Sequence, residues 1–367
     1  MALRGLLAAL FFGGAPGAAA LPRPRPQEPR RLAARAAEEN PLPDPAPADL
    51  SSWADGPKAA EASELVAASI RSLVGDHNLT IAAFDRWADQ TVSGHLLSGE
   101  GWETEHTRSL CSTFRDVGGG VGNFLDVGAN IGTFTIPMAD CLAHVQTAAL
   151  EEGSTGRVIA VEGMPPTADH LVVGILANRL HNVDVYTYAV GGPHDPRRVT
   201  MSLNPVNKGG SAVKGNKPFT NMSDDELQDL FHPNKKSRQF AKKVEVKDFS
   251  VELTTGDRML HGNPAMKAIM VAKVDIEGHE GHFLQGSQLL FSKFPPCFMT
   301  IELIPEWLER AGTPVQGILD LLESWGYKHV PTVEQLSQGT VESKTRTVEQ
   351  RDMAKCLQRV RSYAAQR

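Results

Sequence analysis

Four side chains capable of acid–base chemistry stand within six consecutive positions: Asp275, Glu277, His279 and Glu280. They begin where the apolar run 269–275 ends, and the length and composition of that run predict a buried strand. A carboxylate or an imidazole beside a substrate can take the proton of a hydroxyl group. We therefore predict Asp275 and His279 as candidate bases, with Glu277 and Glu280 as orienting groups. A structural role stays open, in which Glu280 caps the next helix and Asp275 braces a loop.

A divalent ion held by Asp275 and Glu277 is another use of the same oxygens, because hard cations prefer oxygen ligands. Sugar hydroxyls use carboxylates equally well, and nothing else in the sequence points to an ion, so we predict no metal site. The cysteines are scattered without the spacing of zinc ligands, and the core is large enough to fold without disulfides. They are Cys111, Cys141, Cys297 and Cys356.

A turn containing two glycines forms a second candidate site, with Asp126, Gly128, Asn130 and Gly132. Glycine at 128 allows a tight turn, and glycine at 132 allows close approach to the following helix. A dinucleotide fingerprint would need glycine at 130 and 133, where Asn130 and Thr133 stand, and the Lys-Ser/Thr pair of a P-loop is missing. The turn instead suits a ligand carrying an amine and a carboxylate, such as the methionine part of S-adenosylmethionine.

Two glutamates stand at the ends of other apolar runs. Glu162 ends the run 157–162, where a carboxylate can accept hydrogen bonds from ribose hydroxyls. A glutamate there is often incidental, but its pairing with the turn at 126–132 favours a nucleoside-bearing ligand. Glu302 lies near the end of the run 298–303, and we predict that it binds substrate hydroxyls.

These residues need a scaffold that brings strand ends together. Short apolar runs alternate with amphipathic helical stretches, and this pattern predicts a mostly parallel sheet covered on both faces. Such a doubly wound, Rossmann-like α/β sheet binds ligands at the carboxyl ends of its strands, where the strand order reverses. The predicted strands cover 124–128, 157–162, 183–190, 269–275 and 298–303.

In this order, the motifs resemble the FkbM-type, S-adenosylmethionine-dependent methyltransferases over residues 100–330. The resemblance rests on segments 124–132, 161–162, 189–191, 273–280 and 301–302, and Trp102-Glu103 is similar to the family's upstream aromatic–acid pair. It implies a class I methyltransferase fold with S-adenosylmethionine as cofactor. It places Asp126, Gly128, Asn130 and Gly132 around the methionine part and Glu162 on the ribose. It also implies O-methylation of a hydroxyl on a sugar, glycan or natural product; a non-catalytic binding protein on the same scaffold stays open.

The remaining segments are organised around that domain. A positive start, an apolar run at 6–12 and small residues at 18–20 predict a signal peptide over 1–20. A Pro/Arg/Ala-rich, disordered leader is expected over 21–57. We further predict a helical N-terminal cap over 58–122, with helices at 58–72 and about 103–114. The methyltransferase domain covers 123–330 with a polar insertion at about 192–245, and a polar C-terminal tail with one helix covers 331–367.

The signal peptide predicts the secretory pathway, either the lumen of the ER or Golgi or secretion. An organelle such as a plastid is the alternative, because an arginine-rich leader after a signal peptide fits a bipartite signal. Two glycosylation sequons, at Asn78 and Asn221, are compatible with the secretory route. No stable membrane span is expected once the signal is cleaved.

Charge limits the class of partner. The chain carries 37 basic and 43 acidic residues, a net charge of −6, which argues against nucleic acid as the main partner. We expect a small-molecule or glycan acceptor. Basic runs at 235–238 and 242–243 could contact an anionic glycan, although a solvated surface loop is the simpler interpretation.

Overall fold

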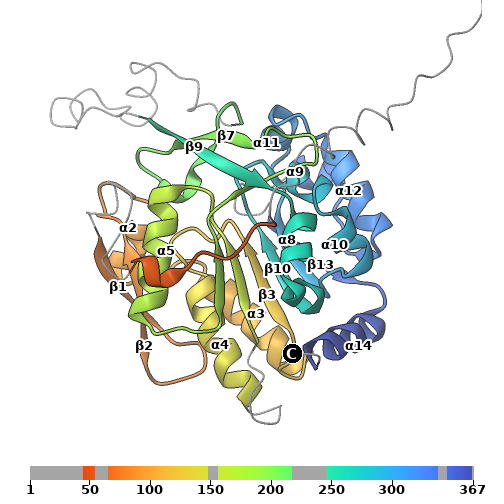
Figure 1. Cartoon of the computed structure of the whole chain (residues 1–367), viewed down its shortest axis with the longest axis horizontal. Coiled ribbons are helices and arrows are strands. Elements are labelled where there is room, and N and C mark those ends of the chain that lie inside the picture. The colour runs from red at the N-terminus through yellow and green to blue at the C-terminus, as the bar shows by residue number, and fades with distance from the viewer. Residues whose placement is uncertain (1–43, 54–64, 148–155, 217–245, 338–344, 366–367) are drawn as a thin grey trace, which may run out of the picture. The chain divides into compact units, whose positions relative to one another are not determined.

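A computed structural model of the 367-residue chain describes residues 44–53, 65–147, 156–216, 246–337 and 345–365. A seven-stranded sheet lies at its centre (Figure 1), with the strand order β12-β13-β11-β10-β3-β4-β5. The strands from β11 to β5 are parallel, whereas β13 runs antiparallel to both of its neighbours. Their bounds are β3 Asn123–Val127, β4 Val158–Val161, β5 Val183–Tyr186, β10 Ile269–Val274, β11 Phe298–Glu302, β12 Tyr327–Lys328 and β13 Thr345–Gln350.

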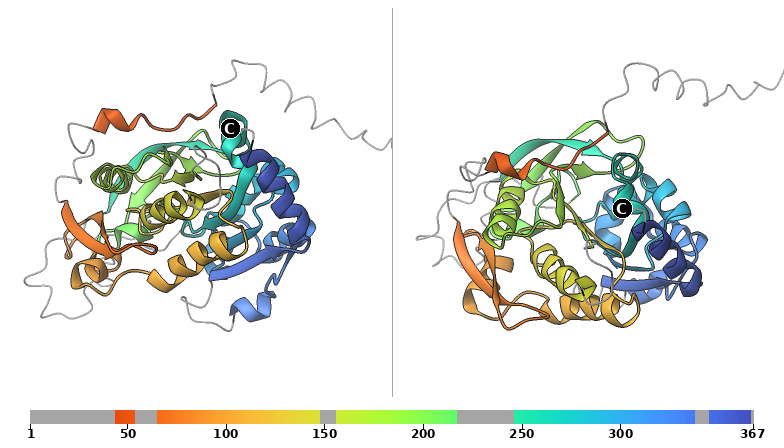
Figure 2. Two further views of the ribbon diagram at one scale, coloured as in Figure 1. Left: turned by 90° about the horizontal axis from the view of Figure 1, so that it is seen from below. Right: turned by 60° about the horizontal axis from the view of Figure 1, so that its bottom comes forward.

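Helices cover both faces of this sheet (Figure 1, Figure 2). Neighbouring strand residues such as Phe124 and Leu125 are both fully buried, but they belong to two different hydrophobic cores, because successive side chains of a strand point to opposite faces. One core contains α3 Thr104–Asp116, α4 Thr135–Thr147, α5 Pro165–Ala177 and α14 Met353–Ala364. The other contains α8 Gly256–Gly262, α9 Glu280–Gln285, α10 Gln288–Lys293, α11 Pro305–Arg310, α12 Val315–Ser324 and α13 Val333–Ser337. The predicted α/β class is confirmed.

The strand order reverses between β3 and β10, and the two strand ends touch there. From β3 the chain builds outward through β4 to β5, then returns to β10 on the other side of β3. Gly128, directly after β3, has φ +83°, and a Cβ at this position would lie 1.8 Å from the carbonyl oxygen of Asp275. Only glycine permits both the backbone conformation and this approach.

All five predicted strands are present, and the helix expected at about 103–114 is α3. The predicted strand 183–190 is divided into β5 and β6 Ala189–Val190. Strand β6 belongs to a second sheet of order β6-β9-β7-β8. Its other strands are β7 Arg198–Leu203, β8 Ala212–Val213 and β9 Lys247–Thr254, with the 3₁₀ turn η3 Lys208–Gly210 between β7 and β8.

The polar insertion is therefore not simply a surface loop. Its part up to residue 216 supplies two strands to the second sheet, which extends from the carboxyl ends of the main strands (Figure 1). Polar composition hid these strands, because much of β7 is partly or fully exposed. The basic runs at 235–243 and the sequon at Asn221 lie outside the described residues.

The prediction of a helix over 58–72 is wrong for its described part. Residues Val66–Arg71 form β1, which pairs antiparallel with β2 Asn78–Ala83. The hairpin packs on α5, where the Asn178 side chain accepts from Thr80 N at 2.9 Å and donates to Thr80 O at 2.6 Å. This packing overrides the helical preference of an alanine-rich segment. The N-terminal part also contains the helix α2 Val92–Ser98.

The predictions of a disordered leader and a polar tail also need correction. Residues 44–53, including η1 Leu50–Trp53, lie along the edge of the main sheet, where Ala48 N donates to Val185 O of β5 at 2.6 Å. Trp53 Nε1 donates to Asp169 of α5 at 2.7 Å. At the other end, α14 lies where the tail helix is predicted, but β13 is inserted into the main sheet between β11 and β12.

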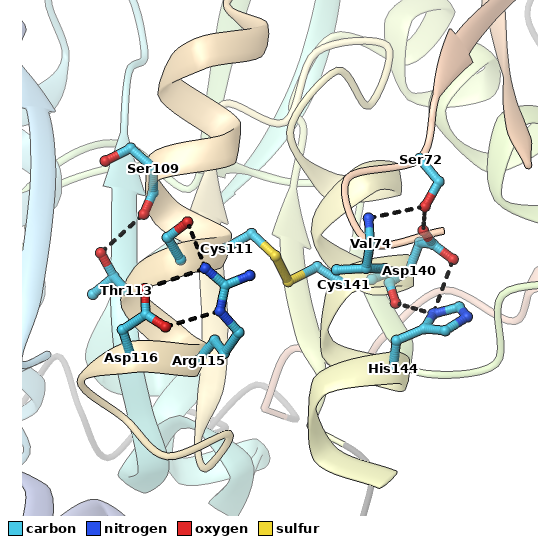
Figure 3. Close-up of a disulfide and its surroundings, with 12 residues drawn as sticks. Ser72, Val74, Ser109, Cys111, Thr113, Arg115, Asp116, Asp140, Cys141 and His144 are labelled. Atoms are coloured by element: carbon cyan, nitrogen blue, oxygen red, sulfur yellow. Dashed lines mark hydrogen bonds and ion pairs between the residues drawn. A yellow bond between two sulfur atoms is a disulfide. The ribbon is translucent and has the colours of Figure 1, made fainter. Parts of the chain in front are cut away.

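Two disulfides join elements of the fold, although the sequence gave no reason to require them. Cys111 of α3 bonds Cys141 of α4 (Figure 3), and Cys297 before β11 bonds Cys356 of α14. Beside the first bond, Ser72 after β1 donates to Asp140 of α4 at 2.6 Å. In the described ranges, no helix combines the length and the apolar character that a membrane crossing requires.

Candidate functional site

A cavity of about 450 Å³ opens at the carboxyl ends of β3, β4, β10 and β11. Its volume lies within the range of small-molecule sites, and its place is the one expected for an open α/β sheet, where the strand order reverses. Two halves can be distinguished by the strands that line them. The β3–β4 half lies beside the glycine turn, and the β10–β11 half is formed by segment 273–279 and the end of β11.

Three residues predicted for cofactor binding line the β3–β4 half: Gly128, Asn130 and Glu162. The Glu162 carboxylate accepts from Asn130 N at 2.9 Å and from Met164 N at 2.8 Å, so it holds the turns after β3 and β4 together. Burial raises the pKa of Glu162 to about 7. Each carboxylate oxygen has a second lone pair with which it can accept a ligand hydroxyl.

The other two predicted cofactor residues do not line the cavity. Asp126 is fully buried, accepts from Thr135 Oγ1 at 2.6 Å and lies 3.8 Å from Lys273 Nζ. Gly132 has φ +94°, and a Cβ there would meet Leu171 at 2.8 Å. Both residues support the conformation of the turn from outside the cavity, where the chain passes from β3 into α4.

An apolar wall completes the β3–β4 half. It is formed at the ends of β4 and β6 and by β7, and a Cβ at Gly163 would lie 2.9 Å from the sulfur of Met201. The sequence did not single out these residues, because β7 is distant from β4 in the sequence and reaches the end of β4 only when the chain is folded. The wall consists of Val161, Tyr188, Val190 and Met201. Such a surface suits a flat, apolar ring.

Lys273 also lines the β10–β11 half, and the sequence did not single it out as a candidate. Its ammonium donates to Gly128 O at 2.8 Å and lies 3.3 Å from Asp275 Oδ2. Burial by itself lowers the pKa of Lys273, but Asp275, Asp126 and Glu103 outweigh burial and raise that pKa above its usual value. A permanent positive charge therefore lies beside the predicted base. Lys273 belongs to the motif 273–280, but its role could not be inferred from the sequence, because its partners Gly128 and Asp126 are far away in the chain.

Of the predicted substrate-side residues, Asp275, Glu277 and Glu302 line the cavity. Glu277 has φ +61°, and Gly278 has φ +95°, so a tight turn carries these side chains. A Cβ at Gly278 would lie 2.8 Å from Cβ of Trp307, which lines the same half. Trp102 and Glu103, directly before α3, also line the cavity.

His279 lines the cavity, but its ring contacts residues outside the β10–β11 half. Nδ1 lies 3.0 Å from Asn216 Nδ2, and Nε2 lies 3.5 Å from Asp195 Oδ2. The ring stacks on His282 with 4.3 Å between centroids. Burial lowers the pKa of His279, and the neighbouring His279 and His282 rings hold the pKa of Asp195 well below its usual range.

Glu280 is a brace behind the cavity wall. It is only 1% exposed, and its Oε1 accepts from Ile276 N at 2.8 Å and from Gly278 N at 3.2 Å. Burial raises the pKa of Glu280 to about 7. These bonds hold the turn that presents Asp275 and Glu277, so Glu280 is placed to orient other groups rather than to touch a ligand.

Two sets of side chains in the described part of the chain are close enough to share a cation, with ligand atoms within 4.8 Å of one another. One set is Asp195, His279 and His282, and the other is Asp275, Glu280 and Glu302. The pair Asp275 and Glu277, weighed from the sequence, is in neither set. We assign no metal to either set.

The turn η3 forms a roof over the glycine turn. A Cβ at Gly209 would lie 2.3 Å from Nδ2 of Asn130, and Gln90 N donates to Val206 O at 2.9 Å. The cavity-lining residues of this roof, which we define as 207–211, come from the segment that the sequence analysis treated as an insertion. The roof makes the cavity a partly enclosed site.

The site and the sheet together define an α/β protein with a small-molecule cavity at its strand ends. A family model, the methyltransferase FkbM domain, matches residues 126–329. This is more than half of the chain, which therefore belongs to the FkbM methyltransferase family. No curated protein matches this sequence.

Proposed function

We propose that the protein is an S-adenosylmethionine-dependent O-methyltransferase whose acceptor is a hydroxyl group of a sugar, glycan or other natural product. One observation carries this proposal: the glycine turn with Glu162 and the acids Asp275 and Glu302 line one cavity of about 450 Å³. The first set suits an amino acid and a ribose, and the second suits hydroxyl groups. Family membership supports methyl transfer in general.

We further propose that the main sheet is the doubly wound, Rossmann-like sheet of a class I methyltransferase. Numbered along the chain, its five parallel strands have the order 3-2-1-4-5, which agrees with the doubly wound order up to the fifth strand. The crossing between β3 and β10 is the switch point, and Gly128 lies there. This order supports a ligand held across the ends of β3, β4 and β10.

The described residues fit the proposed cofactor. Gly128 and Asn130 would hold its amino-acid part, Glu162 its ribose hydroxyls, and the apolar wall around Met201 its adenine ring. Thr167 also lines the cavity, and its buried Oγ1 has no hydrogen-bond partner among the described residues. When bound, S-adenosylmethionine supplies a methyl group activated by a positively charged sulfur.

The chain's own residues would then align the acceptor and take its proton. Alignment can supply ~7–11 kcal/mol of a barrier, and a placed base adds about 10²–10⁴-fold in rate. Asp275 is the better base, because it lines the acceptor half while the His279 ring faces Asp195 and Asn216. Lys273, 3.3 Å from Asp275, stabilises the carboxylate. Glu277 and Glu302 would orient neighbouring hydroxyls.

Two measurements test the function. Calorimetry should detect binding of S-adenosylmethionine, and a labelled-methyl screen over glycans, lipids and small hydroxylated metabolites should find an acceptor. Transfer to oxygen that disappears in Asp275→Asn while the cofactor still binds would support the proposal. Absence of cofactor binding by a folded chain would contradict it.

We also propose that the protein works in the secretory pathway. All four cysteines are paired, and Cys111, Cys141, Cys297 and Cys356 are each at most 5% exposed. Stable disulfides are typical of oxidising compartments. Asn78, the first residue of β2, is exposed, as a glycosylated asparagine must be. This favours the lumen over a plastid interior.

A further inference from the structure

The roof brings a second positive charge to the cavity. Lys208, the first residue of η3, lines the cavity although only 8% of the residue is exposed. The next residue, Gly209, lies directly against the Asn130 side chain, where a Cβ would come within 2.3 Å of Nδ2. Lys208 is therefore attached to the part of the roof that covers the glycine turn.

Helix α5 supplies a polar group to the same corner. Thr167 lines the cavity, is 1% exposed, and has an Oγ1 without a hydrogen-bond partner in the described part of the chain. His170 lies three residues further along α5, on the same face of the helix. Burial lowers the pKa of His170 to about 4, and the charge of Lys208 contributes to this shift. The Lys208 charge therefore acts on the face of α5 that carries Thr167.

The other charges on the cavity wall leave few places for an anion. Carboxylates dominate the wall, namely Glu103, Glu162, Asp275, Glu277 and Glu302. Lys273, the other cavity-lining lysine, lies close to Asp126 and Asp275, which offset its charge. An anionic group entering the cavity is repelled by the acids and attracted to the corner of Lys208 and Thr167.

The start of α4 favours the same kind of ligand. Thr133 and Phe134 line the cavity immediately before this 13-residue helix begins at Thr135. The amino-terminal end of a helix carries a partial positive charge and unsatisfied N–H groups. A carboxylate held between the roof and this end of the helix would meet favourable charge from both.

From these contacts we propose that Lys208 and Thr167 form the subsite that binds the carboxylate of the cofactor's amino-acid part. This inference rests on the proposed function. Lys208 supplies a positive charge for the carboxylate, and Thr167 supplies a hydroxyl donor. Gly128 and Asn130 lie below the roof on the glycine turn. With this subsite the roof, which lies between β7 and β8, takes part in cofactor binding.

A pair of ligands isolates the carboxylate. S-adenosylmethionine and its decarboxylated form share the adenosine, the sulfonium and the amine, and differ only in the carboxylate. Their affinities can be measured by calorimetry for the wild-type chain and for Lys208→Met, Lys208→Arg, Thr167→Val and Thr167→Ser. Lys214→Met is the matched control, because Lys214 follows β8 on the same hairpin, is exposed, pairs with Asp248 and does not line the cavity.

We expect Lys208→Met to lose about 10- to 100-fold in affinity for S-adenosylmethionine, the usual effect of losing a hydrogen bond to a charged group. Its affinity for the decarboxylated ligand should stay within about twofold, and Lys208→Arg should recover most of the loss. Thr167→Val should lose about 2- to 10-fold for the intact cofactor alone, whereas Thr167→Ser and Lys214→Met should bind like the wild-type chain.

The other outcomes overturn the inference in distinguishable ways. Equal losses for both ligands in Lys208→Met would mean that the lysine only holds the roof. Unchanged affinities in both Lys208→Met and Thr167→Val would mean that the carboxylate binds elsewhere. If the folded wild-type chain binds neither ligand, the proposed function fails, and this subsite fails with it.

Discussion

Asp275 and His279 are the two bases that the sequence offers, and their surroundings differ. Asp275 lies on the acceptor half of the cavity with Lys273 at 3.3 Å, while the His279 ring is held by Asn216 and Asp195. The sequence places both residues at a strand end but cannot tell which one faces the cavity. That distinction depends on Asp195, 84 positions away from His279.

The first prediction separates the two bases. Asp275→Asn should lower methyl transfer by about 10²–10⁴-fold, because the general base is lost, and should leave cofactor affinity within a few-fold. His279→Ala should lower turnover much less. Labelled-methyl assays with calorimetry in parallel measure both quantities. Near-normal turnover in both variants would contradict the proposal that either residue acts as the general base.

The second prediction concerns Glu280 and pH. Its pKa is raised from 4.5 to about 7 by burial, so the folded chain keeps this proton to higher pH than the unfolded chain does. The stability that the protonated group contributes is present below pH 4.5 and is lost as the pH rises to about 7. Gln retains an acceptor for Ile276 N and Gly278 N but carries no charge.

Glu280→Gln should therefore match the wild-type chain near pH 4 and be more stable at pH 8. The gain should approach about 3 kcal/mol, since each unit of pKa shift corresponds to ~1.4 kcal/mol. Urea unfolding at a series of pH values measures the difference. Glu323→Gln, at an exposed position of α12, is the control and should show no such trend. A constant difference across the series would contradict the argument.

Among the elements, those buried on both faces could be predicted and those built from half-exposed residues could not. Strands β3, β4 and β10 are buried at every position, so each reads as a mostly apolar run, interrupted only by Asn123 and Asp126 in β3 and by Lys273 in β10. Strand β13 has only Val348 as an apolar residue and was taken for a polar tail. Strand β1 is alanine-rich, and its pairing with β2 depends on support from α5.

The third prediction belongs to the contact between β3 and β10. Gly128→Ala would put a Cβ 1.8 Å from a backbone oxygen at a φ of +83°, so the two strand ends must separate. We expect a loss of at least ~3 kcal/mol in unfolding free energy, at the upper end of single substitutions, and loss of cofactor binding. Gly317→Ala, in α12 with open space around it, should stabilise by about 0.5–1 kcal/mol. Similar stabilities for the two variants would contradict the assigned role of Gly128.

At the scale of the whole molecule, the disulfides connect helices to one another and to the main sheet. Cys111–Cys141 joins the neighbouring helices α3 and α4, and Cys297–Cys356 joins the start of β11 to the last helix. The sequence could not reveal these pairs, because their spacings of 30 and 59 residues fit no motif. The second bond encloses the chain from β11 to the start of α14, so it constrains the acceptor-side strand β11 and the elements that follow it.

The last prediction joins this architecture to the compartment. A 59-residue loop closed by a disulfide reduces the entropy of the unfolded chain by an amount equivalent to about 4 kcal/mol. Replacing Cys297 and Cys356 by serine should therefore lower the melting temperature by several degrees. Reductant should lower that of the wild-type chain further, because it opens both bonds, and should still lower that of the variant, which keeps Cys111–Cys141. Chain produced through a secretory route should show no free thiol by mass spectrometry after alkylation. Four free thiols in active protein taken from its native compartment would contradict both the pairing and the secretory location, because cysteines that stay reduced in the working enzyme require a reducing environment.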